Sequence, residues 1–186
     1  GYNTELTYPV PAMPETPFNT TGGIHEVPAG TPGRLYVCGK HHIGPDVTAV
    51  LADTNNAHVV CLVETHELEH RYDDYLRWLR ANDGTAATWA PIHDMHVAGF
   101  TESLSLFTRI ADMLRGGTNV VVHCAAGIGR AGTTAAGALM MLGMRSDAAL
   151  AHLRAHRPMA GPQTMVQQLL LDQLQTHLDA SQAQND

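Results

Sequence analysis

The segment that most constrains the fold is residues 120–142. It begins with three consecutive valines, starting at Val120, which predict a buried strand. Residues 123–130 follow with the sequence His-Cys-Ala-Ala-Gly-Ile-Gly-Arg, and small residues then continue to Leu142. We therefore expect a strand, a tight loop and a helix that begins at the loop. Backbone amides of such a loop converge on one point, and the helix N-terminus adds partial positive charge, so the loop fits a tetrahedral oxyanion.

Three side chains of this loop predict phosphate chemistry. Cys124 lies at its base, where the positive field would hold the sulfur as a thiolate, the nucleophilic form. Arg130 can hold two phosphate oxygens at once, which a lysine cannot match. His123 precedes the nucleophile and is expected to orient the loop through hydrogen bonds. The candidate phosphate-binding residues are Ala125, Ala126, Gly127, Ile128, Gly129 and Arg130.

The string His-Cys-x5-Arg after a strand resembles the signature of the protein-tyrosine and dual-specificity phosphatase superfamily. Residues 34–178 are similar to the small atypical dual-specificity type, such as kinase-associated phosphatase and the phosphatases of regenerating liver. The resemblance implies a cysteine-dependent hydrolase without a cofactor. It also implies a phosphocysteine intermediate on Cys124, with Arg130 holding the phosphate of a phosphotyrosine, phosphoserine or phosphothreonine.

The leaving oxygen needs a proton, and Asp94 is the candidate general acid. It follows the extended residues 89–92, on a predicted loop. The resembling family has a Pro-Asp pair at this place, and His93 stands where that proline would be. The resemblance further implies that Gln163 or Gln167 holds the water that hydrolyses the phosphocysteine.

Ala131 departs from the family pattern, in which a serine or threonine follows the arginine and its hydroxyl stabilises the departing sulfur. Thr133 should not replace it, because two residues along a helix turn a side chain by about 200°. Two alternatives therefore stay open beside ordinary turnover. In the first alternative, the protein is a slow enzyme that accumulates phosphoenzyme. In the second, it is an adaptor that binds a phosphorylated partner without hydrolysing the phosphate.

Net charge and composition limit the classes of partner and substrate that the protein is expected to bind. The net charge of −7 argues against broad attraction to nucleic acid or to an anionic membrane, so anion binding must be local. The loop also contains no lysine, and this favours a singly phosphorylated protein or peptide over an inositol phosphate. No signal peptide pattern opens the sequence, and Cys38, Cys61 and Cys124 lack disulfide-framework spacing, so a reducing cytoplasm is expected.

Other patterns offer competing interpretations. Residues 66–70 spell His-Glu-Leu-Glu-His, the zinc-protease pattern, but no third ligand follows and a solvated helix face is preferred; no metal is expected. Cys61 lies on a strand expected beside the active one, where it would be a redox partner of Cys124 or a buried apolar cysteine. Rhodanese-like sulfur transfer fits less well, because that loop is usually shorter.

Alternation of strands and helices predicts an α/β fold with a mostly parallel central sheet flanked by helices on both faces. Strands are expected at residues 34–38, 57–63, 88–92 and 118–123. Helices are expected at residues 46–52, 67–80, 102–115, 130–143, 146–156 and 164–179. Residues 1–33 would form an irregular arm, residues 34–179 the phosphatase domain and residues 180–186 a polar tail.

Overall fold

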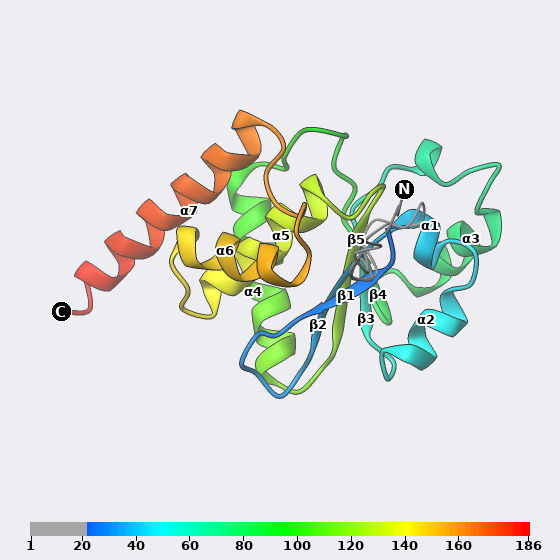
Figure 1. Ribbon diagram of the computed structural model, residues 1–186, viewed down its shortest axis with the longest axis horizontal. Coiled ribbons are helices and arrows are strands. Elements are labelled where there is room, and N and C mark those ends of the chain that lie inside the picture. The colour runs from blue at the N-terminus through cyan, green and yellow to red at the C-terminus, as the bar shows by residue number, and fades with distance from the viewer. Residues whose placement is uncertain (1–21) are drawn as a thin grey trace, which may run out of the picture.

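A five-stranded sheet organises the computed structural model, which describes residues 22–186 (Figure 1). The strand order is β1-β2-β5-β3-β4. The strands are β1 (Ile24–Val27), β2 (Leu35–Gly39), β3 (His58–Cys61), β4 (Ala87–Trp89) and β5 (Val120–Cys124). Strand β1 pairs antiparallel with β2, whereas β2, β5, β3 and β4 run parallel to one another. The prediction of a mostly parallel sheet is therefore confirmed.

Helices cover both faces of this sheet, as expected (Figure 1). One face carries α1 (Lys40–Ile43), α2 (Val47–Asp53) and α3 (Asp73–Asn82). The other carries α4 (Phe100–Arg115), α5 (Gly129–Met141), α6 (Ser146–His156) and α7 (Met165–Ala183). Within residues 22–186, no helix is both long and apolar enough to cross a membrane.

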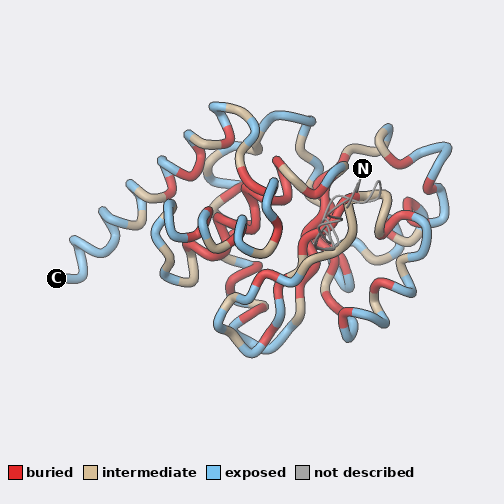
Figure 2. Tube along the Cα trace, in the orientation of Figure 1, coloured by how far each residue is buried: buried red, intermediate tan, exposed pale blue. Residues whose placement is uncertain are grey.

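Strand β5 and helix α5 form the buried centre of the molecule (Figure 2). Every residue of β5 is buried, and the small residues of α5 let neighbouring elements approach closely. A Cβ atom on Gly137 would lie 2.6 Å from the Phe107 ring, and one on Gly132 would lie 2.2 Å from the backbone nitrogen of Gly161. The loop between β5 and α5 is thus fixed at both ends by packed elements.

Two expected irregular segments contain regular structure. Strand β1 lies in the expected irregular arm, where it pairs antiparallel with the next strand, β2; its short run Ile24–Val27, between glycine- and proline-containing segments, gave no strand signal of its own. Residues 1–21 of that arm lie outside the described residues. The expected tail is helical as far as Ala183, since α7 continues through it.

The helix expected at residues 67–80 is broken. A 3-10 turn, η1 (Thr65–Glu67), ends there, and α3 begins only at Asp73. Between them His70 adopts a left-handed backbone with φ of 70°, and its N–H donates to the Asp73 carboxylate at 2.8 Å. The two histidines of the zinc-protease pattern therefore do not share one helix face.

Candidate active site

The loop that follows β5 turns its carbonyl groups toward the protein. The carbonyl oxygen of Ala125 accepts from the N–H of Lys40 at 2.9 Å, and that of Ile128 accepts from the N–H of Gly161 at 3.0 Å. The carbonyls of Ala126 and Gly127 both accept from the Arg157 guanidinium, at 3.1 and 2.7 Å. Among the described residues, the amides of residues 125–130 have no partner. These amides are left to bind an anion.

Cys124 ends β5 and lies under this loop. Its residue is 3% exposed, and the Ala131 N–H donates to its sulfur at 3.4 Å. Helix α5 begins at Gly129, so its positive end faces the same sulfur. The Thr133 hydroxyl has no partner within the described residues and so does not bind Cys124, in agreement with the sequence-based expectation.

Arg130 is oriented by a carboxylate. Its side chain is 1% exposed, and Nη1 and Nη2 donate to the two Glu67 oxygens at 2.8 and 2.7 Å. Nη1 also donates to the Ile92 carbonyl at 2.8 Å. Burial, the largest single influence, opposes the charge, but the hydrogen bonds to Glu67 and the nearby acidic groups together outweigh it and raise the pKa of Arg130. Nη1 is thereby saturated, and the edge formed by Nε and Nη2 remains for two phosphate oxygens.

The structure brings Asp94 to this edge. Its exposed carboxylate lies 3.3 Å from Arg130 Nη2. The segment that carries it is fastened on one side by Gln167 Nε2, which donates to the His96 carbonyl at 3.3 Å. On the other side His93 Nδ1 lies 3.3 Å from a Glu64 oxygen. Asp94 therefore lies beside the Nη2 end of the Arg130 guanidinium.

His123 lies in the core, next to the residue at which the loop begins. It is fully buried, Tyr75 Oη lies 2.6 Å from its Nε2, and its Nδ1 lies 3.2 Å from the Cys124 carbonyl oxygen. Burial lowers the pKa of His123 to about 4, so the ring is neutral. A neutral ring satisfies both contacts if Nδ1 donates to the carbonyl and Nε2 accepts from the tyrosine.

The two candidate water-holding glutamines both lie beside the loop, but they differ in their contacts. Gln167 is buried, its Oε1 accepts from the Gln163 N–H at 2.8 Å, and its Nε2 is bound to His96. The Gln163 side chain has no partner within residues 22–186, and its Oε1 would lie 2.4 Å from a Cβ atom on Gly129. Gln163 is thus the glutamine whose amide is free to hold a water.

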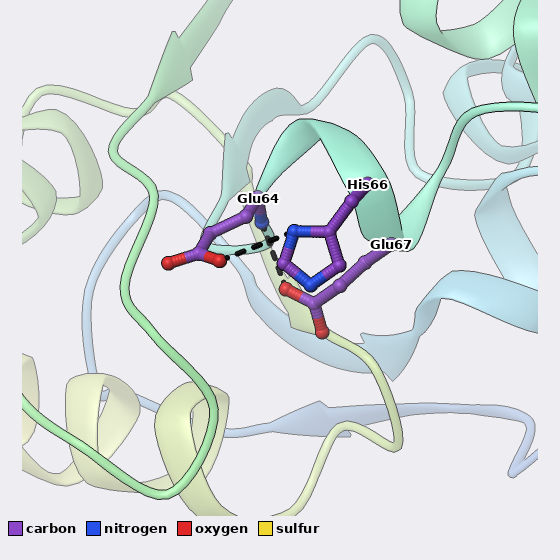
Figure 3. A group of neighbouring side chains, drawn as sticks. All are labelled: Glu64, His66 and Glu67. Atoms are coloured by element: carbon purple, nitrogen blue, oxygen red, sulfur yellow. Dashed lines mark hydrogen bonds and ion pairs between the residues drawn. The ribbon is translucent and has the colours of Figure 1, made fainter.

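Within residues 22–186, Glu64, His66 and Glu67 form a group that resembles a metal site, with ligand atoms within 4.8 Å of one another (Figure 3). Both Glu67 oxygens are already hydrogen-bonded to Arg130, and one also accepts from the Glu64 N–H at 2.8 Å. The second histidine of the zinc-protease pattern, His70, lies outside the group. The geometry therefore assigns Glu67 to Arg130 and not to zinc.

Cys61 lies on β3 beside the active strand, opposite His123. Burial raises the pKa of Cys61 to about 12, which leaves it a thiol at neutral pH. The chemistry of a redox partner needs a thiolate, so this environment favours the alternative of a buried apolar cysteine.

Sequence reasoning missed the roles of Glu67 and Arg157. Arg157 is buried and, besides the loop carbonyls, contacts the Gly23 carbonyl at 3.2 Å and His25 Nδ1 at 2.6 Å. Both residues act across long sequence separations. The available sequence signal for Glu67 was its position shortly after a predicted buried strand, at residues 57–63.

A buried cysteine, a ring of free amides and an oriented arginine at the carboxyl end of a parallel strand define a cysteine-dependent phosphatase. The family described as "Swiss Army Knife protein, DSP-PTPase phosphatase domain" matches residues 30–184, and the chain belongs to this family. No curated protein matches the sequence significantly.

Solved structures show the same fold. Tk-PTP in its active form is 26% identical, with a TM-score of 0.64 over 81% of this chain and 96% of that one. Kinase associated phosphatase, with its catalytic-site cysteine replaced by serine, is 18% identical, with a TM-score of 0.68 over 85% and 96%. PTPMT1 in complex with PI(5)P is 16% identical, with a TM-score of 0.67 over 85% and 97%.

Proposed function

We propose that this phosphatase hydrolyses phosphotyrosine, and phosphoserine or phosphothreonine, in proteins or peptides. The proposal is supported by three neighbouring features of one strand–loop–helix segment: the Cys124 sulfur bonded to the Ala131 N–H, the unpartnered loop amides and the Arg130 guanidinium oriented by Glu67. The phosphate would bind to the amides of residues 125–130 and to Arg130 Nε and Nη2. Helix α5 and these donors would stabilise the equatorial oxygens as negative charge shifts in the transition state.

In the first step the Cys124 thiolate attacks phosphorus. An S–P bond forms, the P–O ester bond breaks, and Asp94 donates its proton to the leaving oxygen. In the second step a water held by Gln163 gives its proton to the Asp94 carboxylate and attacks phosphorus. The P–S bond breaks, inorganic phosphate forms, and Cys124 leaves as a thiolate.

The substrate class is supported by the lining of the loop. Ala125, Ala126 and Ile128 provide no cation for a second phosphate, and the nearby Lys40 donates to the Glu67 carbonyl at 2.9 Å. A single phosphate on a side chain matches this arrangement. PTPMT1 is a structural relative whose complex contains a phosphoinositide, so inositol phospholipids belong in the test as competing substrates.

The test compares Asp94→Asn with wild type on two substrates. A phosphotyrosine peptide should lose about 10²- to 10⁴-fold in kcat, because its leaving phenoxide needs the proton. 4-Nitrophenyl phosphate has a more acidic leaving group and should lose much less. Cys124→Ser should abolish turnover yet retain phosphopeptide binding, and Asp73→Asn is the matched exposed control. Equal losses on both substrates for Asp94→Asn would refute the acid assignment.

Ala131 favours a second candidate, an enzyme whose phosphocysteine is hydrolysed slowly. Among the described residues, the Ala131 backbone N–H gives the one hydrogen bond to the Cys124 sulfur, and no hydroxyl bonds to it. A burst of leaving group followed by slow turnover would identify this case. Binding of phosphopeptide without any burst would identify the adaptor.

A further inference from the structure

Arg157 links the first strand of the sheet to the phosphate-binding loop. The residue is 3% exposed, and two of its nitrogens bind the loop, because Nε donates to the Gly127 carbonyl at 2.7 Å and Nη2 donates to the Ala126 carbonyl at 3.1 Å. The third nitrogen, Nη1, lies 2.6 Å from Nδ1 of His25 and donates to the Gly23 carbonyl at 3.2 Å. One guanidinium therefore joins the half-buried ring of His25, on β1, to the loop.

The two carbonyls that Arg157 holds set the direction of two loop amides. A trans peptide points its C=O and N–H in opposite directions, so the Ala126 carbonyl orients the Gly127 N–H and the Gly127 carbonyl orients the Ile128 N–H. Both amides belong to the set that has no partner within residues 22–186. Gly127 has a φ of 70°, and a glycine backbone rotates with little steric resistance. Arg157 is thus a contact that holds these amides in the direction an anion needs.

Protonation of His25 conflicts with its contact to Arg157. A guanidinium can only donate, so Nδ1 of His25 accepts with its lone pair, and the ring is neutral with its proton on Nε2. A second proton on Nδ1 would remove this acceptor and would set two positive charges against each other. Nη1 would keep its contacts with the Gly23 and Val37 carbonyls, at 3.2 and 3.4 Å. The expected result is a displaced guanidinium that still has partners.

The groups closest to His25 reinforce this conflict. Burial, the charge of Arg157 and the neighbouring His42 of α1 all lower the pKa of His25, in that order. On β2, burial raises the pKa of the Cys38 thiol to about 12, so this group stays uncharged near neutral pH. Neither α1 nor β2 therefore supplies a negative charge that would stabilise a protonated ring.

Helix α6 and the rest of β1 do not compensate either. Helix α6 carries His152 and His156, and both rings are bonded to backbone carbonyls. Glu26 follows His25 on β1, so its side chain points to the opposite face of the sheet, and its carboxylate lies 3.6 Å from Arg34 Nε. The carboxylate on the same strand is thus engaged elsewhere.

We infer that His25 is a positioning residue that, through Arg157, makes oxyanion binding by the loop depend on pH. The neutral ring fixes Arg157 and, with it, the amides of Gly127 and Ile128. Because the pKa of His25 is lowered from 6.5, the ring is neutral at pH 7 and gains its proton as the pH falls below 6.5. Acidification would then displace Arg157 and weaken phosphate binding. The inference rests on the phosphate site of the proposed function, but it does not require turnover.

The test measures the dissociation constant of tungstate, a tetrahedral oxyanion, by isothermal titration calorimetry at pH 7.5 and at pH 5.5. Wild type is compared with His25→Asn, because the asparagine oxygen can accept from Arg157 and the amide does not titrate. The two proteins should bind tungstate alike at pH 7.5, whereas wild type should bind about 3- to 10-fold more weakly than His25→Asn at pH 5.5. The ratio of the two constants removes every effect of acidification that both proteins share.

Two further variants separate the acceptor from the charge. His25→Leu removes the acceptor and does not titrate, so it should bind tungstate about 3- to 10-fold more weakly than His25→Asn at both pH values. His25→Gln repeats the first comparison with a second acceptor and covers the case in which His25→Asn does not fold. His177→Asn, at an exposed histidine of α7, is the matched control and should follow wild type at both pH values.

The outcomes distinguish the role of His25 from the proposed function. The inference is overturned if wild type does not bind tungstate, or if the ratio of wild type to His25→Asn is the same at pH 7.5 and pH 5.5. Hydrolysis of phosphopeptides together with an unchanged ratio would refute the role of His25 alone. The expected change in ratio in a protein that hydrolyses no phosphopeptide would refute the proposed function and not this inference.

Discussion

Removing the negative charge of Glu67 should disable the enzyme by releasing Arg130. The two carboxylate oxygens accept from Arg130 at 2.7 and 2.8 Å, in a place where the Glu67 side chain is only 11% exposed. Burial opposes ionisation, but Arg130 and the Glu64 N–H outweigh it and lower the pKa of Glu67. In Glu67→Gln the side-chain oxygen can keep one bond, while the new amide hydrogens face the guanidinium.

The loss can be estimated from these contacts. One charge-assisted hydrogen bond is worth about 1.5–3 kcal/mol. If that energy positions Arg130 for the transition state, kcat/KM on a phosphotyrosine peptide should fall about 10- to 150-fold. The free energy of unfolding should fall by a similar amount, because a buried arginine loses half of its pairing. Steady-state kinetics and urea unfolding measure the two effects.

Glu69→Gln is the matched control, since Glu69 is exposed and close in sequence. It should change kcat/KM by less than about twofold, as surface substitutions rarely exceed about 0.5 kcal/mol. The argument fails if Glu67→Gln keeps kcat/KM within twofold of wild type, or if Glu69→Gln loses as much. Recovery of activity in Glu67→Asp is not expected, because the shorter side chain cannot span both bonds without moving the 3-10 turn.

Three further predictions concern the surroundings of Cys124. Ala131→Ser should speed hydrolysis of the phosphocysteine by about 10- to 150-fold through one hydroxyl bond to sulfur, measured by rapid quench; an unchanged rate would contradict this. Arg157→Met should leave the Ala126 and Gly127 carbonyls without their hydrogen bonds to the guanidinium. The free energy of unfolding should fall by about 2 kcal/mol or more, and vanadate should bind more weakly. Unaltered vanadate affinity would exclude a role of Arg157 in shaping the loop. His123 has a pKa lowered from 6.5 to about 4, so its contribution to stability is complete above pH 6.5 and is lost as pH falls to 4. Wild type should therefore lose about 3 kcal/mol more than His123→Asn across that range, and parallel urea-unfolding curves would refute this.

The sequence was sufficient for the fold class and for the loop because both depend on local patterns. The valine run, the glycines and the small residues after Arg130 predict a strand, a turn and a helix within one short segment. The helix expected from residue 46 is present, and the Asp46 carboxylate caps it by accepting from the Ala49 N–H at 3.0 Å. Asp94 was placed by its position after an extended segment, and the structure brings it to Arg130.

The rest depends on contacts that a linear pattern does not contain. The partnership of Glu67 with Arg130 joins the 3-10 turn η1 to the first turn of α5 through space, and the sequence showed only a glutamate after a strand. The break near His70 also could not be predicted, because a left-handed histidine and a carboxylate cap override the helical spacing of the apolar residues. Strand β1 was missed for a different reason: it has only four residues, and its pairing with the next strand is not visible in so short a pattern.

The reach of Arg157 has a practical consequence for anyone choosing where to begin the protein for expression. The family match starts at residue 30. Arg157 nevertheless contacts the Gly23 carbonyl and the His25 ring, which both precede that residue. A chain cut at residue 30 would retain Cys124 and Arg130 but would strip two supports from the guanidinium that holds the catalytic turn. Such a truncated protein would show a phosphatase activity lower than that of the intact domain. Strand β1 should therefore be kept in any expressed form of the domain.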